Sequence, residues 1–111
     1  MVREVDQSQF ADAHAQRHLV VDVREAAEYA DGHVPGARSV PLAALAGHAA
    51  ELPAGEPVYV ICASGNRSKA GAEVLTRAGL DAYSVAGGTR GWLEAGRPVV
   101  TGTGPTTGDT R

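Results

Sequence analysis

Cys62 is the only cysteine in the sequence and the side chain best suited to nucleophilic chemistry. It follows an apolar, β-branched run at 58–61 and precedes a short polar loop with Gly65 near its centre. This order predicts a buried strand that ends at a thiol, then a loop, then a helix that begins near Ser68. Backbone N–H groups of such a loop and of a helix N-terminus favour an anion, and the thiolate is the nucleophilic form of cysteine. The segment therefore predicts a reactive thiol rather than an inert buried one.

The loop contains two further residues whose types suit this chemistry. Gly65 allows the loop to curl with its amides inward, where a Cβ would interfere. Arg67 carries a planar guanidinium that suits the oxyanion end of a donor molecule, and the alternative is a structural role in fixing the loop. No side-chain general base stands next to Cys62 in the sequence, so we expect the backbone amides to activate the thiol.

The composition restricts the class of protein and its partners. The 111 residues, 43% hydrophobic and 21% charged, fit one soluble globular domain. A net charge of −3 argues against nucleic acid as a partner. A single cysteine cannot form an internal disulfide, no apolar run approaches the ~18 residues of a membrane span, and no leader segment is recognisable. We therefore expect a cytoplasmic protein without a membrane partner, and the scattered histidines predict no metal site.

Strand and helix signals alternate along the chain, which predicts a parallel sheet with crossover helices. The expected strands are 2–5, 19–23, 39–40, 58–61 and 83–86. The expected helices begin at Asp6 or Ser8, cover 26–30, run from 42 to about 52, follow the Cys62 loop, and cover 89–95. From residue 101 onward the chain lacks apolar periodicity, which predicts a domain of residues 1–100 and a disordered tail at 101–111.

Ligands of parallel sheets bind at the carboxyl ends of the strands, and three features of the sequence stand at such ends. They are Asp22, Cys62 and the Gly87-Gly88 turn. We expect Asp22 to fix neighbouring loop amides or to help orient the Cys62 loop. The i, i+4 spacing of Arg24 and Glu28 predicts a structural ion pair at the start of a helix.

Several motifs occur together in a characteristic order. They are Asp22-Val23-Arg24-Glu25, Glu28-Tyr29, Gly32-His33-Val34-Pro35-Gly36-Ala37, Cys62-Ala63-Ser64-Gly65-Asn66-Arg67-Ser68, and Gly87-Gly88 with Trp92. In this order and spacing the chain resembles a single-domain rhodanese of the rhodanese-like sulfurtransferase family, over nearly all of its length. The resemblance implies an α/β rhodanese-like fold, with a five-stranded, mostly parallel sheet and helices on both faces.

The resemblance also implies a sulfurtransferase that needs no cofactor. By position, Cys62 matches the nucleophile that carries the transferred sulfur as a persulfide. The loop that would bind the transferred group consists of Ala63, Ser64, Gly65, Asn66, Arg67 and Ser68, and Asp22 and Arg24 would support it. The implied partners are a small sulfur donor, such as thiosulfate, a persulfide or a polysulfide, and a cyanide or thiol acceptor, including a protein thiol.

Three alternatives remain beside this interpretation. Cysteine phosphatases use a Cys-x5-Arg loop, and the Cys-x4-Arg spacing here leaves room for a single sulfur rather than a phosphate. A sulfur carrier would take the persulfide from a protein partner and pass it on. A non-catalytic binding module of this fold is the third, although inactive relatives typically lose the cysteine or the loop glycine, and both are present here.

Overall fold

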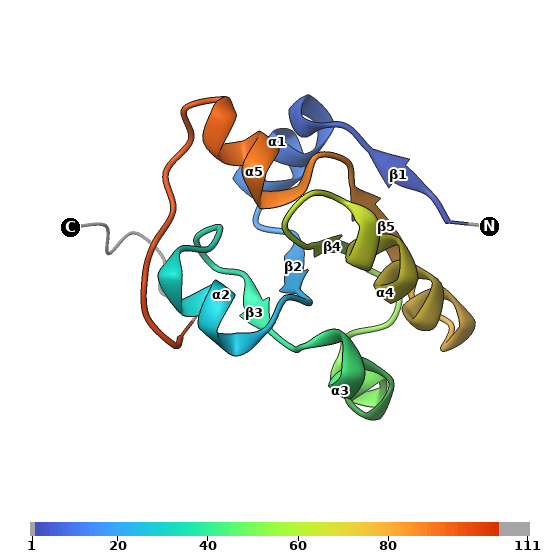
Figure 1. Cartoon of the computed structure of the whole chain (residues 1–111). Helices are drawn as coiled ribbons and strands as arrows, with labels where there is room; N and C mark the ends of the chain where they lie inside the picture. The colour runs from blue at the N-terminus through green and yellow to red at the C-terminus, as the bar shows by residue number, and fades with distance from the viewer. Residues whose placement is uncertain (1, 105–111) are drawn as a thin grey trace.

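The computed structural model describes residues 2–104, and a five-stranded sheet forms its centre (Figure 1). The strands are β1 (Glu4–Val5), β2 (Leu19–Asp22), β3 (Arg38–Ser39), β4 (Pro57–Ile61) and β5 (Asp81–Val85). The helices are α1 (Gln7–Ala15), α2 (Ala26–Asp31), α3 (Leu42–His48), α4 (Asn66–Arg77) and α5 (Gly88–Glu94), with a 3-10 turn η1 (Ala49–Glu51) after α3.

The strands follow the order β1-β5-β4-β2-β3, and every pair of neighbours is parallel. β4 is therefore the central strand, and Cys62 follows its carboxyl end directly. The predicted α/β architecture with helices on both faces is confirmed. Within residues 2–104, no helix has the length and apolar character needed to cross a bilayer.

Successive residues of β4 contribute to two separate apolar cores, as the pleat of a strand requires. Val58 and Val60 join the core beneath α3 and α4, which contains Leu45 and Leu75. Ile61 joins the opposite core. Phe10 of α1, Tyr29 of α2 and Trp92 of α5 fill that second core. Figure 1 shows α3 and α4 on one side of the sheet and α1 and α5 on the other.

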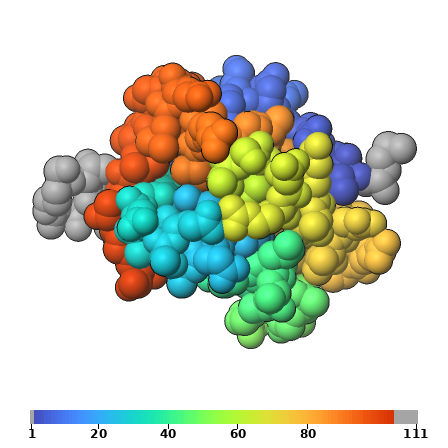
Figure 2. Space-filling model, viewed as in Figure 1, coloured from blue at the N-terminus to red at the C-terminus, as the bar shows by residue number. Residues whose placement is uncertain are grey.

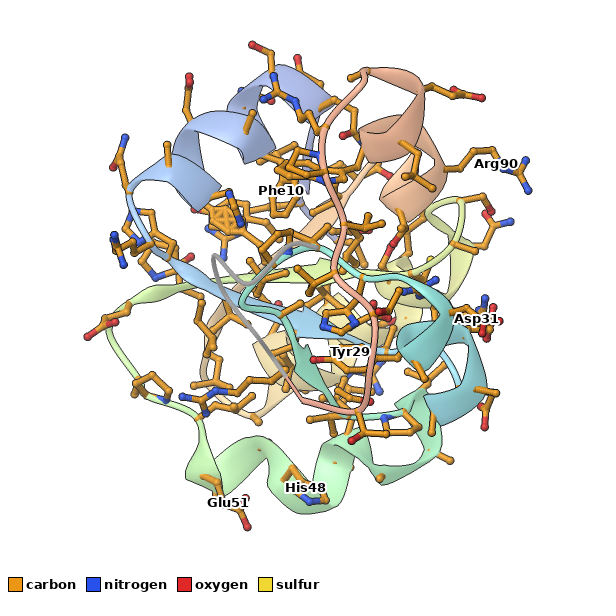
Figure 3. All side chains as sticks on the ribbon, turned by 90° about the vertical axis from the view of Figure 1, so that its left-hand side faces the viewer. Phe10, Tyr29, Asp31, His48, Glu51 and Arg90 are labelled. Carbon is orange, nitrogen blue, oxygen red and sulfur yellow. The ribbon has the colours of Figure 1, made fainter. Side chains whose placement is uncertain are left out.

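The positions of labelled side chains agree with this division. In Figure 3, Phe10 and Tyr29 lie within the molecule, while His48, Glu51 and Arg90 lie at its periphery. Tyr29 is 1% exposed, and its hydroxyl donates to the backbone oxygen of Ala37, so it belongs to the core.

Most predicted elements occur, with shifted ends. Of the two predicted starts of the first helix, Asp6 or Ser8, the structure selects Asp6 as the N-cap, and its carboxylate accepts from the Gln9 N–H at 2.8 Å. The helix after the Cys62 loop begins at Asn66, earlier than predicted, so Asn66, Arg67 and Ser68 form its first turn. The N-terminus of α4 is therefore close to Cys62 in the sequence, and its unpaired N–H groups are available to bind the thiol.

The predicted tail begins close to the end of the described chain. His33 and Val100 exchange two backbone hydrogen bonds of 2.9 Å, and the Gly102 N–H donates to the Ala30 oxygen at 3.0 Å. Residues 105–111 lie outside the described residues. The domain of residues 1–100 and the disordered tail at 101–111 therefore stay predictions.

Candidate active site

The sulfur of Cys62 lies at the N-terminus of α4, where backbone N–H groups point at it. Sγ accepts hydrogen bonds from the Gly65 N–H at 3.1 Å and the Ser68 N–H at 3.2 Å. Gly65 has a φ of 114°, a conformation that L side chains rarely adopt, and it turns the chain from β4 into α4. The first N–H groups of a helix have no partner within the helix, so the thiol receives a donor that the fold leaves available.

The thiol is buried, with Cys62 only 1% exposed. Burial raises the pKa of the thiol, because it disfavours the charged form. The Ser68 hydroxyl and the N–H groups of Ser68, Gly65 and Ser64 act in the opposite direction and outweigh burial, so the pKa of Cys62 is lowered overall. The site therefore favours a thiolate although it is nearly closed to solvent.

A chain of buried hydroxyl groups extends from the sulfur into the sheet. Ser68 Oγ lies 3.5 Å from Cys62 Sγ, donates to the Gly65 oxygen at 3.1 Å, and lies 2.7 Å from Ser84 Oγ. Ser84 is a residue of β5 and has no exposed surface. Sequence reasoning did not select Ser84, because a serine in a short strand carries no local signal for such a contact.

The carbonyl groups at the start of the loop are bound by α5. The Cys62 oxygen accepts from the Thr89 N–H at 2.8 Å and from Thr89 Oγ1 at 3.0 Å, and the Ala63 oxygen accepts from the Arg90 N–H at 3.0 Å. These bonds fasten the start of the loop to α5, while the Gly65 and Ser68 N–H groups of the same loop and helix donate to the sulfur. The Gly87-Gly88 turn, which the sequence placed at a strand end, leads into α5, whose residues supply these donors.

The guanidinium of Arg67 forms two hydrogen bonds to the carboxylate of Glu28 on α2. The distances are 2.8 Å from Nη1 to Oε1 and 2.9 Å from Nη2 to Oε2, and both side chains are 38% exposed. The side-chain hydrogen bonds with Arg67 lower the pKa of Glu28 to about 2. In this geometry Arg67 fastens the Cys62 loop to α2. The positive charge of Arg67, which we expected to bind the oxyanion of a donor, is therefore compensated by the Glu28 carboxylate.

The predicted ion pair between Arg24 and Glu28 is wrong. Arg24 binds Asp22 instead, through a buried contact of 2.8 Å between Nη2 and Oδ2. Helix α2 begins at Ala26, so Arg24 precedes the helix and the i, i+4 spacing does not apply to it.

Asp22 and Arg24 together fix the turn after β2. Asp22 Oδ1 also accepts from the Arg24 N–H at 3.1 Å, and Arg24 Nη2 donates to the Gly32 oxygen at 2.8 Å. Among the described residues, the hydrogen bonds of these two side chains reach the turn before β3 and not the Cys62 loop.

The remaining predicted loop residues form the rim of the site. Ala63 is half-buried, and Ser64 and Asn66 are exposed. In Figure 2 the segments that contain α2, the N-terminal half of α4, and α5 meet on the face turned toward the viewer. Within residues 2–104, no three His, Cys, Asp or Glu side chains are grouped as metal ligands would be.

Comparison with known proteins gives consistent results. The family model described as Rhodanese-like domain matches residues 5–95. A sulfurtransferase of Allochromatium vinosum is 31% identical over 103 residues, which cover 90% of this chain and 96% of that protein. YrkF of Bacillus subtilis, described as a putative sulfur carrier protein, is 36% identical over 74 residues, which cover 66% of this chain and only 40% of that protein.

The fold has a close match among solved structures. The crystal structure of a rhodanese-related protein from Thermoplasma volcanium superposes with a TM-score of 0.83 at 33% sequence identity. The match covers 90% of this chain and 99% of that one.

Proposed function

Because the chain belongs to the rhodanese-like domain family, we propose that it is a sulfurtransferase that carries a sulfane sulfur as a persulfide on Cys62. The observation that carries this proposal is the pair of N–H groups, from Gly65 and Ser68, that donate to the Cys62 sulfur at 3.1 and 3.2 Å. Such donors stabilise a thiolate before the reaction, and they suit the electron-rich sulfur of a persulfide afterwards.

In the first step, the Cys62 thiolate attacks the terminal sulfur of the donor. A bond forms between Sγ and that sulfur, the bond to the rest of the donor breaks, and its electron pair leaves with the donor remainder as sulfite or a thiolate. In the second step, a nucleophilic acceptor bonds to the outer sulfur and the electron pair of the broken S–S bond returns to Sγ. The electron count balances over the two steps, so no cofactor takes part.

The surroundings of the thiol restrict the donor. With Cys62 only 1% exposed, a donor has to present its transferable sulfur as a terminal atom, as thiosulfate, persulfides and polysulfides do. Thiosulfate would also place an oxyanion near Arg67, where it competes with the Glu28 carboxylate. This competition favours a persulfide or polysulfide donor, with a thiol or cyanide as acceptor. A single cysteine further supports a function in a reducing compartment such as the cytoplasm.

The proposal is tested by mass spectrometry of the intact protein after incubation with thiosulfate or inorganic polysulfide. We expect an added mass of one sulfur atom on Cys62, lost again on addition of cyanide or a thiol. The Cys62→Ser variant should fold and gain no adduct. A wild-type protein that reacts with iodoacetamide at Cys62 but never gains sulfur from any donor would identify a non-catalytic binding module instead.

A role as a sulfur carrier between proteins is a second candidate, favoured by the similarity to a protein described as a putative sulfur carrier. The chemistry at Cys62 would be the same. Transfer from the isolated Cys62 persulfide would then be fast to a protein thiol and slow to cyanide and small thiols.

A further inference from the structure

Ser84 places a hydroxyl group in an otherwise apolar part of the molecule. Its Cα pairs with that of Val60 across β4 and β5, and it has no exposed surface. Val60 and Ala82, two residues earlier on the same face of β5, both belong to the apolar core beneath α4. A buried hydroxyl in such surroundings is unfavourable unless its proton has an acceptor.

The hydrogen bond between Ser84 and Ser68 has one favourable direction, because each buried hydroxyl proton needs an acceptor. Among the described residues, the Ser84 hydroxyl has a single partner, Ser68 Oγ at 2.7 Å. The Ser68 hydroxyl has an acceptor in the Gly65 oxygen at 3.1 Å. It also lies 3.5 Å from the Cys62 sulfur, which donates to Ser68 Oγ as a thiol and can accept from it as a thiolate. If Ser68 donated to Ser84, the Ser84 proton would be buried without an acceptor. Ser84 therefore donates, and the Ser68 proton is left for the side that faces the loop.

We propose that Ser84 is a positioning residue that, by donating to Ser68, directs the Ser68 hydroxyl proton toward the Cys62 sulfur. This inference rests on the proposed function. When the thiol is neutral, the Ser68 hydroxyl donates its hydrogen bond to the Gly65 oxygen. When Sγ carries negative charge, the same hydroxyl rotates to donate to it, while its own oxygen still accepts from Ser84. Hydrogen bonds in such a chain strengthen one another.

Both steps of sulfur transfer place negative charge on Sγ. The thiolate is the attacking group in the first step, and in the second step Sγ is the leaving group that regains the electron pair. Ser84 acts on both steps through Ser68 and touches neither reactant. The sequence shows no such role, because Ser68 and Ser84 stand 16 residues apart.

The charged groups around the site remain the same in the variants that test this proposal. The guanidinium of Arg67 is paired with the Glu28 carboxylate, and this pairing is the main cause of its raised pKa. The negative charge of Cys62 raises the pKa of Arg67 further. The Asp22–Arg24 pair lies at the carboxyl end of β2. Removing a serine hydroxyl changes none of these charges, so a change in the titration of Cys62 reports the hydroxyl chain.

The test is a double-mutant cycle with Ser68→Ala, Ser84→Ala and the double variant. The readout is the rate of Cys62 alkylation by iodoacetamide against pH. We expect Ser84→Ala to raise the midpoint by about half a pH unit, which is about a threefold lower rate at pH values well below the midpoint. Ser68→Ala should raise it further, and the double variant should equal Ser68→Ala, because Ser84 acts only through Ser68.

A fourth variant, Ser84→Thr, separates the hydroxyl from packing. It keeps the hydroxyl and adds a methyl group to a filled core, so its melting temperature should fall while the alkylation midpoint stays at the wild-type value. Additive shifts in the double variant, an unchanged midpoint in Ser84→Ala, or equal shifts in Ser84→Thr and Ser84→Ala would each overturn the proposal. The alkylation assay uses no sulfur donor, so its outcome is independent of whether the protein transfers sulfur.

Discussion

Gly88→Ala is the substitution that tests most directly how α5 supports the Cys62 loop. Gly88 has a φ of +58°, and a Cβ built on it lies 2.6 Å from the Cys62 oxygen and 2.7 Å from the carbonyl carbon and oxygen of Ala63. All three atoms belong to the backbone of the loop, so they cannot move aside as the end of a flexible side chain would.

The expected cost has two parts. Placing an alanine in the left-handed region costs about 1–2 kcal/mol. Relieving an overlap with packed backbone costs about 1–3 kcal/mol more. The free energy of unfolding should therefore fall by about 2–5 kcal/mol, a large part of the stability of a small domain.

Gly79→Ala is the matched control. Gly79 also has a positive φ, of +91°, but a Cβ there meets nothing within 4 Å. This variant should lose only the conformational part, about 1–2 kcal/mol. The difference between the two variants, measured by urea unfolding, isolates the contact between Gly88 and the loop.

A second measurement tests the effect on the site. An added methyl group at position 88 pushes the loop carbonyls away from the Thr89 and Arg90 N–H groups that bind them, so the amides that face Cys62 lose their alignment. We expect alkylation of Cys62 at neutral pH to slow in Gly88→Ala and to stay unchanged in Gly79→Ala. Equal unfolding free energies for the two variants, or an unchanged alkylation rate in Gly88→Ala, would refute this account of the loop.

Four further outcomes follow from the site. The alkylation rate of wild-type Cys62 should show a midpoint below the ordinary thiol value of about 8.5, and a midpoint at that value would contradict the hydrogen-bond geometry. Glu28→Gln should lower the KM for thiosulfate about three- to tenfold, with little change for a polysulfide, because it releases the Arg67 guanidinium. Since the pKa of Glu28 is lowered to about 2, the pair stabilises the wild type above pH 4.5 and this stability is lost as the pH falls toward 2. For an exposed pair it amounts to about 1 kcal/mol, and acid titration of Glu28→Gln should lack it. Asp22→Asn leaves Arg24 buried without its carboxylate and should cost about 3–5 kcal/mol in urea unfolding, whereas the double variant with Arg24→Met should cost less.

Local rules were sufficient for much of the fold. The apolar runs that become β2 and β4 are buried on both faces, and β-branched runs with short connections are typical of a parallel sheet. The ends of elements were predicted less well. The helix after Cys62 begins at Asn66 because Gly65 turns the chain there, and the pattern of apolar residues does not register that turn.

The partners of charged side chains were predicted poorly where the spacing rule was applied outside a helix. The i, i+4 rule assigned Glu28 to Arg24, but Arg24 precedes α2 and turns back to Asp22. Glu28 binds Arg67, which stands 39 residues away. Folding brings these two side chains together because α2 and α4 both begin at the carboxyl edge of the sheet.

The sequence by itself singled out Cys62 as the proposed nucleophile and predicted its place at the end of a buried strand, because both inferences use residues that are neighbours in the chain. The tertiary structure alone decided what surrounds the sulfur. Thr89, 27 residues further along the chain, donates to the Cys62 carbonyl oxygen. Ser84 contacts Ser68 from β5, the strand that pairs with β4. Such contacts depend on strand order and register, which place distant residues side by side, and no local pattern in the chain encodes them.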